Sequence, residues 1–358
     1  MTVDLASIDS ASTGQLLAEL SLLRQWPDKS HSHLVARIGL ALERRNALKL
    51  TKTKTDAIEQ VATAALETGH LSLAKTLIAR LTAHFREEPY GLHRVNYLAG
   101  MLLEAQGDLA AAKEFYQQKL RDDETDVAVR KRLTALHLSS PVVDLPAASS
   151  SSSSKPSAVP ATLAPYVAAS LTQSQGIALL VSYLDTYYLD LSSWLVLSTA
   201  YSALAQYPLA LTALDHAIVL APHDPFVQLK YAETAYSAGD VPLAYKAYLR
   251  TVEMATEKGT EGEVMNRKGG ATRRAVLGAK LCLARLRTAT SSDKSSSRSD
   301  DDPSLAPKRL DEMDLLLSRL LLESVAAAPG GAGPGGPAQS TKDAMRSWLG
   351  GAAAVNVK

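Results

Sequence analysis

Histidine and cysteine, the usual metal ligands and nucleophiles, are few and scattered along this sequence. The eight histidines stand at positions 31, 33, 70, 84, 93, 137, 216 and 223, and Cys282 is the one cysteine. His31 and His33 have no acidic or cysteine partner at a spacing that suits a metal ion. No phosphate-binding loop, dinucleotide-binding glycine motif or Gly-x-Ser-x-Gly turn occurs. The pattern predicts a protein that is not an enzyme, with no metal, no cofactor and no small-molecule substrate.

Charge and composition argue against several other classes. The chain has 38 Lys+Arg and 37 Asp+Glu, a net charge of +1, so bulk positive charge cannot drive nucleic-acid binding. Hydrophobic residues make up 46% but aromatic ones only 5%, and this reliance on Ala and Leu favours helices over strands. The first residues, Met1–Leu5, lack a signal-peptide pattern, and no run approaches the ~18 apolar residues of a membrane span. Together with the single cysteine, this predicts a cytoplasmic protein.

The elements that position the side chains are helices that repeat. From Leu191 the apolar, small and proline residues recur at fixed positions of a 34-residue unit: Trp194, Leu197, Tyr201, Tyr207, Ala210, Leu214, Ala217 and Pro222. A second unit begins at Pro225, after Asp224 as a helix N-cap, and its turn at Gly239 follows the turn at Ala205 by 34 residues. Looser units surround Gly69 and Gly107. The spacing predicts an all-α fold, a tetratricopeptide-repeat solenoid of helix–turn–helix units.

The physical basis of such a repeat is close packing of its two helices. Small residues at positions 8 and 20 let the helices approach, and large residues at positions 4, 7, 11, 17 and 24 fill the space around that contact. We expect Trp194 to be buried in this way. The residues predicted to pack the repeats are Gly100, Ala112, Trp194, Tyr201, Ala210, Ala232 and Ala244.

Segments rich in Ser, Pro and Gly interrupt the helical pattern. Residues 1–52 contain two amphipathic segments, Thr13–Arg24 and His33–Arg45, which we expect to cap the solenoid.

The repeats then run over residues 53–287. A disordered Ser/Pro insert at 139–165 splits one repeat into two parts, Val127–Leu138 and Gln173–Tyr188. A disordered linker at 288–307 precedes a C-terminal helix at 308–325. The tail, 326–358, is rich in Ala, Gly and Pro and includes a possible short helix at 340–349.

Two surfaces are candidates for binding partners. The first helices of such repeats line a groove, and its apolar and aromatic character suits a partner helix or an extended segment. The groove candidates are Tyr97, Met101, Leu195, Thr199, Phe226, Leu229, Glu233 and Tyr236. The second surface is basic, and the candidates are Arg267, Lys268, Arg273, Arg274, Lys280, Arg285 and Arg287. This basic surface either faces anionic headgroups or acidic partners, or is a solvated helix face.

The order of these features resembles one known family. Leu71–Arg132, with LAGMLLEAQGDLAAAKEFYQQKL, and Ser192–Asp240, with its YAETAYSAGD end, are similar to subunit 2 of the endoplasmic reticulum (ER) membrane protein complex. The resemblance implies a cytosolic scaffold, peripheral at the cytoplasmic face of the ER membrane. It also implies that the partners are other subunits of a complex that inserts tail-anchored and multi-spanning membrane proteins. The Ser/Pro insert and the Ala/Gly-rich tail depart from the family.

A tetratricopeptide co-chaperone or adaptor that binds a peptide in the groove is the alternative. Chaperone-binding proteins of this kind share a carboxylate clamp, formed by Lys, Asn and Arg side chains at positions 5 and 9 of the repeat. Here those positions hold Tyr97, Met101, Leu195, Thr199, Leu229 and Glu233, so the clamp is missing. RNA binding through the basic stretches is a minor third option, which steeply salt-dependent affinity would reveal.

Overall fold

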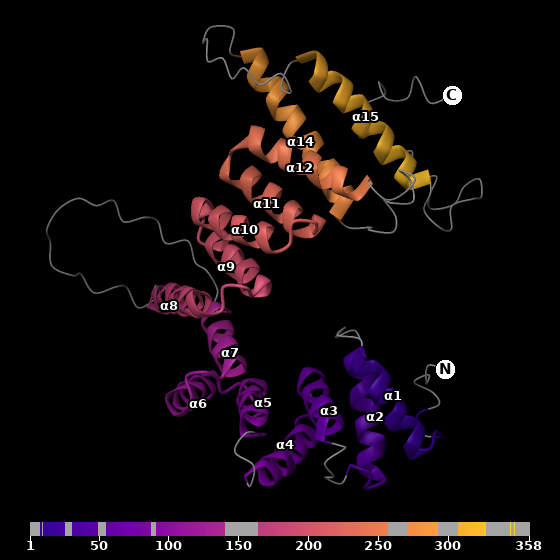
Figure 1. The fold of residues 1–358 in the computed structure, drawn as a ribbon, viewed down its shortest axis with the longest axis vertical. Helices are drawn as coiled ribbons and strands as arrows, with labels where there is room; N and C mark the ends of the chain where they lie inside the picture. The colour runs from indigo at the N-terminus through magenta and orange to yellow at the C-terminus, as the bar shows by residue number, and fades with distance from the viewer. Residues whose placement is uncertain are drawn as a thin grey trace, which may run out of the picture. The chain divides into compact units, whose positions relative to one another are not determined.

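The chain is described by a computed structural model that covers residues 8, 10–25, 31–48, 55–86, 91–139, 164–256, 271–292, 307–326, 344 and 347. Its regular elements over these residues are fourteen α-helices, and no strand occurs among them (Figure 1). The helices of the first half are α1 (Thr13–Gln25), α2 (Ser32–Arg44), α3 (Thr55–Glu67), α4 (Leu71–Phe85), α5 (Leu92–Ala105), α6 (Leu109–Asp122), α7 (Val127–Leu138) and α8 (Ala164–Thr186). Those of the second half are α9 (Leu191–Ala203), α10 (Tyr207–Leu220), α11 (Pro225–Ala238), α12 (Val241–Thr256), α14 (Ala271–Ser292) and α15 (Pro307–Ala326).

Aspartate side chains begin four of these helices. The carboxylates of Asp108, Asp126, Asp224 and Asp240 accept hydrogen bonds of 2.9–3.1 Å from backbone N–H groups in the first turns of α6, α7, α11 and α12. Such a cap satisfies donors that have no partner within the helix. The predicted cap at Asp224 is confirmed, and Pro225 follows it in the first turn, where its missing N–H costs nothing.

A left-handed residue reverses the chain between the two helices of four repeats. Gly69, Gly107 and Gly239 adopt φ values of +79°, +86° and +90° in the α3–α4, α5–α6 and α11–α12 turns. Ala205 takes the equivalent place between α9 and α10 with φ of +57°. Glycine adopts this conformation freely, whereas a side chain crowds the backbone. The 34 residues from Ala205 to Gly239 thus separate two left-handed turns, whereas Gly69 and Gly107 lie 38 residues apart.

Small side chains bring the paired helices together. Ala112, Ala210, Ala232 and Ala244 are fully buried. A Cβ atom on Gly100 of α5 would lie 2.0 Å from the Tyr116 ring of α6, a distance that no real contact reaches. Gly100 therefore makes room for the tyrosine that fills the centre of its repeat.

The same device joins one helix pair to the next in the second half of the chain. A Cβ atom on Gly278 of α14 would lie 2.4 Å from the Tyr248 ring of α12. Close packing of this kind leaves no room for one added methyl group. The all-α tetratricopeptide-repeat fold predicted from the sequence is confirmed.

The chain divides into two compact units, residues 1–179 and residues 180–358. In the first unit α1 and α2 pack with α3, α4 and α5 around a core that includes Leu20, Ile38, Leu42 and Leu77. A smaller core holds Tyr116 between α6 and α7. In the second unit, one core joins α11, α12, α14 and α15. Each unit thus buries apolar side chains of its own.

Several predicted boundaries can be compared with the helices. The N-terminal pair lies within one residue of the predicted bounds. Helix α8 begins at Ala164, nine residues before the predicted start, since Pro165 fits the first turn of a helix. Helix α14 continues to Ser292, beyond the predicted end of the repeats at 287. Most of the insert at 139–165, of the linker at 288–307 and of the tail at 326–358 lies outside the described residues.

Candidate partner-binding surface

The groove candidates of the first unit are held within the repeats. Tyr97 is half-buried and packs against both apolar cores of its unit. Burial raises the pKa of its hydroxyl above the ordinary value. Met101, one turn further along α5, is half-buried against the N-terminal core. Both side chains therefore present only part of their surface to a partner.

Arg94 links the first helices of two successive repeats. Its guanidinium on α5 donates to Asp56 at 2.6 Å and to Glu59 at 2.8 Å, both on α3. The hydrogen bond from Arg94 lowers the pKa of the Asp56 carboxyl. Burial has the opposite and larger effect on Glu59 and raises its pKa. These two hydrogen bonds from Arg94 hold α5 against α3 along the groove face.

A second polar bridge joins α5, α6 and α7. The Tyr116 hydroxyl donates to the Glu104 carboxylate at 2.6 Å, and the Arg132 guanidinium binds the same carboxylate from α7 through Nε at 3.2 Å and through Nη2. Burial, followed by the bond to Glu104, raises the pKa of Tyr116. Glu104 thus anchors the ring that Gly100 accommodates.

In the second unit, Lys230 occupies the groove between α9 and α11. Its ammonium group donates to the Leu195 carbonyl at 3.1 Å and also to the Thr199 hydroxyl, which itself donates to the Leu195 carbonyl at 2.8 Å. Burial lowers the pKa of Lys230. Two of the predicted groove positions, Leu195 and Thr199, are therefore bound by a lysine of the next repeat.

The last groove candidates contact α14. Glu233 accepts a 2.7 Å hydrogen bond from Arg274, and the Arg285 guanidinium lies 4.5 Å from the centre of the Tyr236 ring. Leu229 departs from the prediction, because it is only 2% exposed and belongs to the core of its unit. Helix α14 packs against α11, and Leu229 lies in the core that α11 shares with α12 and α14. Phe226, by contrast, is 55% exposed in the first turn of α11.

Two of the basic candidates of α14, Lys280 and Arg287, bind α15, whereas Arg274 and Arg285 are exposed and contact α11. Lys280 lies 2.7 Å from Asp314 and donates to Ser318, and Arg287 binds Asp311 at 2.6 Å and Asp314 at 3.2 Å. Arg273 is half-buried. Arg267 and Lys268 lie outside the described residues. The acidic partners in the first turns of α15 were missed by the sequence reasoning, although a basic helix followed by an acidic one was the available signal.

The repeat-packing candidates are buried with two exceptions. Trp194 and Tyr201 are half-buried, which corrects the expectation that Trp194 would be buried. The indole N–H of Trp194 donates to the Tyr188 carbonyl at 2.8 Å, and its ring stacks on His216 with centroids 4.4 Å apart. An indole needs a partner for its N–H, so it lies at the edge of the repeat.

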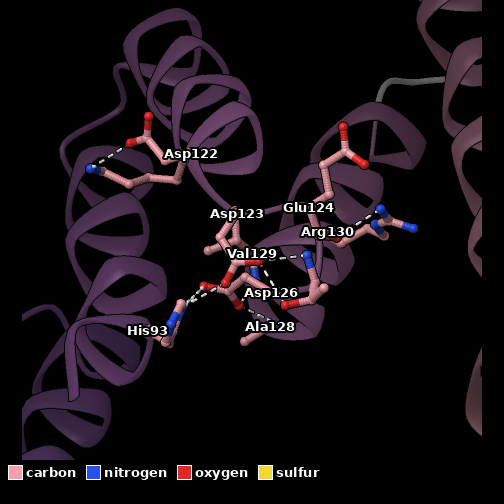
Figure 2. Close-up of polar contacts among 10 residues, drawn as sticks. His93, Asp122, Asp123, Glu124, Asp126, Ala128, Val129 and Arg130 are labelled. Carbon is pink, nitrogen blue, oxygen red and sulfur yellow. Dashed lines mark hydrogen bonds and ion pairs between the residues drawn. The ribbon is translucent and has the colours of Figure 1, made fainter. Parts of the chain in front are cut away.

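A histidine and two aspartates lie close together at the connection between α6 and α7 (Figure 2). Nδ1 of His93, in the first turn of α5, lies 3.2 Å from the Asp123 carboxylate and 3.5 Å from that of Asp126. Asp126 also caps α7, and Arg130 donates to the Glu124 carbonyl at 2.8 Å. The hydrogen bonds of Asp126 and Arg130 hold the turn between α6 and α7.

Within the described residues, no group of three or more His, Cys, Asp or Glu side chains could hold a metal ion. Burial raises the pKa of the Cys282 thiol to about 11. No helix over these residues is both long enough and apolar enough to cross a membrane. The polar groups that the structure brings together join helices to one another.

Comparisons with known proteins agree with this architecture. No model of a protein family matches the chain. The chain is 28% identical to TPR repeat protein oca3 of Schizosaccharomyces pombe over 64% of its length and 72% of that protein. It is 26% identical to ER membrane protein complex subunit 2-A of Xenopus laevis, over 61% of this chain and 62% of that protein.

One solved structure matches over most of the length of this chain. The C-terminal part of a TPR repeat-containing protein from Cytophaga hutchinsonii matches with a TM-score of 0.49 and 15% identity, over 85% of this chain and 97% of that one. The match to the Xenopus relative spans less than two thirds of that protein's length. The resemblance seen in the repeats is confirmed. The chain is an all-α tetratricopeptide-repeat protein, related by sequence to the proteins named ER membrane protein complex subunit 2.

Proposed function

We propose that this chain is a non-catalytic scaffold subunit of an ER membrane protein complex. In that role it lies at the cytoplasmic face of the ER membrane and bridges the cytosolic parts of membrane-embedded subunits. That complex would insert tail-anchored and multi-spanning membrane proteins. The observation that carries the proposal is the sequence match to the subunit 2 proteins, which extends over 61% of the chain.

The internal bonding of the repeats supports a scaffold role. Ion pairs and polar contacts between successive first helices, such as Arg94 with Asp56 and Arg274 with Glu233, hold neighbouring repeats in register. A stack held in this way offers a pre-organised face, which lowers the entropy lost when a partner binds. Phe226 is the large apolar groove candidate that such a face leaves most exposed.

The co-chaperone alternative finds less support in the same face. Recognition of an acidic peptide end needs cations that are free to bind it. Lys230 contacts two of the clamp positions, Leu195 and Thr199, and is already bonded to both. The positions themselves carry no cation.

Affinity purification of the tagged chain from detergent-solubilised membranes, with cytosol in parallel, tests the proposal. We expect near-stoichiometric recovery of several multi-spanning ER proteins from the membrane fraction. Recovery of soluble chaperones alone, or of no partner, would contradict it. Mass spectrometry of both fractions gives the readout.

A matched pair of variants tests the groove within the same experiment. Phe226→Ala should lower partner recovery about fivefold or more, because truncating an apolar anchor at an interface costs roughly 1–2 kcal/mol. Val219→Ala serves as the control, since Val219 is 78% exposed on α10, the second helix of its repeat. Neither change should shift the melting temperature. Equal recovery with both variants would show that the partners bind elsewhere.

A further inference from the structure

The second unit carries more positive than negative charge where α11 and α14 lie side by side. Glu233 of α11 lies 2.7 Å from the Arg274 guanidinium of α14, and the Tyr236 ring of α11 lies 4.5 Å from the Arg285 guanidinium. Lys230, less than one turn before Glu233, bonds to two neutral oxygens of α9. Glu233 is thus the one carboxylate bonded to any of these three cations within the part of the chain that the structure describes.

The two arginines can each bind a further carboxylate. Both are exposed, and their partners Glu233 and Tyr236 are less than one helical turn apart, so the two guanidinium groups gather over one stretch of α11. A contact with an aromatic ring does not use the N–H fork of a guanidinium, which is the part that binds a carboxylate. Arg285 can therefore bind an acid without leaving Tyr236. Arg274 contacts Glu233 through Nη2, and its other nitrogens can bind a second acid.

Exposed apolar side chains flank these cations. Phe226 is 55% exposed and lies about two turns before Glu233 on the same side of α11. Leu281 is 49% exposed, and at 100° per residue it falls within about 40° of Arg274 and Arg285 on α14. We call the surface formed by Phe226, Glu233, Tyr236, Arg274, Leu281 and Arg285 the α11–α14 face. Its chemistry suits a ligand that combines apolar and acidic groups.

The size of the charge surplus indicates which class of ligand fits. Three cations and one carboxylate leave a surplus of 3 − 1 = 2 positive charges. Basic clusters that bind anionic membranes use about 4–8 Lys and Arg, and nucleic-acid binding commonly uses about 6–10 phosphate contacts. Lys280 and Arg287 of α14 add nothing here, because they bind aspartates of α15. A surplus of two charges beside apolar anchors matches a short protein segment.

We propose that the α11–α14 face binds a segment of a partner protein in which acidic residues flank apolar ones. Its carboxylates bind Arg274 and Arg285, and its apolar side chains pack against Phe226 and Leu281. The inference rests on the proposed scaffold function for the existence of a partner, and it adds the chemistry by which that partner is recognised.

A titration of the purified full-length chain with model peptides tests this chemistry. Three fluorescent peptides share one pattern of Leu residues and carry Glu, Gln or Lys at the positions between them. By fluorescence anisotropy, the Glu peptide should bind about tenfold or more tightly than the Gln peptide, and the Lys peptide should bind most weakly. Equal affinities for the three peptides would overturn the proposal.

Matched double variants assign the preference to the face. Arg274→Gln with Arg285→Gln should abolish the preference for Glu, whereas Lys308→Gln with Arg309→Gln, at two exposed cations in the first turn of α15, should keep it. Arg285→Gln alone breaks no ion pair among the described residues and should lower the affinity for the Glu peptide about threefold or more. Melting temperatures check that each variant folds. A preference that survives in the Arg274 and Arg285 variant would overturn the proposal.

Two further arms separate this proposal from its alternatives. If the unchanged chain recovers ER proteins from membranes and the Arg274 and Arg285 variant recovers them equally well, the proposal fails while the scaffold function stands. If the unchanged chain recovers none, the scaffold function fails and the peptide titration alone decides. Vesicles that contain phosphatidylserine provide the last arm. A variant that loses binding to these vesicles but keeps binding the Glu peptide would overturn the proposal and assign the face to a membrane.

Discussion

Ala205 occupies a backbone conformation that glycine holds in the other repeats. A non-glycine residue in the left-handed region costs roughly 1–2 kcal/mol, part of which is recovered because alanine has less freedom than glycine in the unfolded chain. We expect Ala205→Gly to raise the free energy of unfolding by about 0.5–1 kcal/mol. Urea denaturation followed by circular dichroism measures the change.

The opposite substitution one repeat later is the matched control. Gly239 has φ of +90° and would have no atom near an added Cβ, so any effect of Gly239→Ala comes from the backbone alone. It should lower the free energy of unfolding by about 1 kcal/mol. If Ala205→Gly destabilised the chain as well, the left-handed turn would not be the source of strain.

Arg94 shows how pairs of helices are tied across a repeat boundary. Its partners on α3 differ in their titration, because Arg94 lowers the pKa of Asp56 below the ordinary 3.8 while burial raises that of Glu59 above 4.5. Ionised Asp56 therefore stabilises the fold above about pH 4, and this contribution is lost as the pH falls through its lowered pKa. Glu59 gives up its charge first, at a higher pH.

We expect Arg94→Ala to cost about 0.5–1 kcal/mol at pH 7, a modest value because Arg94 and Asp56 are half exposed to solvent. The difference from the unchanged chain should shrink as the pH is lowered from about 5 to below 3.8. Denaturation midpoints measured across this range check the trend. Arg44→Ala, at an exposed arginine of α2, should show a smaller and pH-independent change.

The helices and their small residues could be predicted from the sequence, but the contacts between repeats could not. Ala210 and Ala244 stand out because the distance between paired helices depends on the local repeat alone. The burial of Leu229 and the bonds of Lys230 could not be predicted in this way, because they depend on which residues of the neighbouring repeat face these two side chains. The pairing of Arg287 with Asp311 likewise joins helices separated by an insert. The periodicity of the sequence predicts the structure within one repeat, but it does not predict the angle between successive repeats.

At the scale of the whole chain, separate cores imply separate responses to damage. The apolar clusters of residues 8–98 and of residues 229–321 share no side chain. In repeat proteins, stability is a sum of terms within repeats and between nearest neighbours. A substitution that disturbs one core should therefore loosen the helices around it before it affects the other unit.

Gly100→Ala and Gly278→Ala provide a symmetric test of this independence. Each adds a methyl group that would overlap a tyrosine ring, Tyr116 in the first unit and Tyr248 in the second, at a cost of about 1–3 kcal/mol. Hydrogen–deuterium exchange of the full chain should show faster exchange in α5–α7 for Gly100→Ala and in α11–α15 for Gly278→Ala. Gly14→Ala, where an added Cβ meets no neighbour, should leave exchange unchanged or slower. Faster exchange throughout the chain in either variant would mean that the two units unfold as one cooperative body.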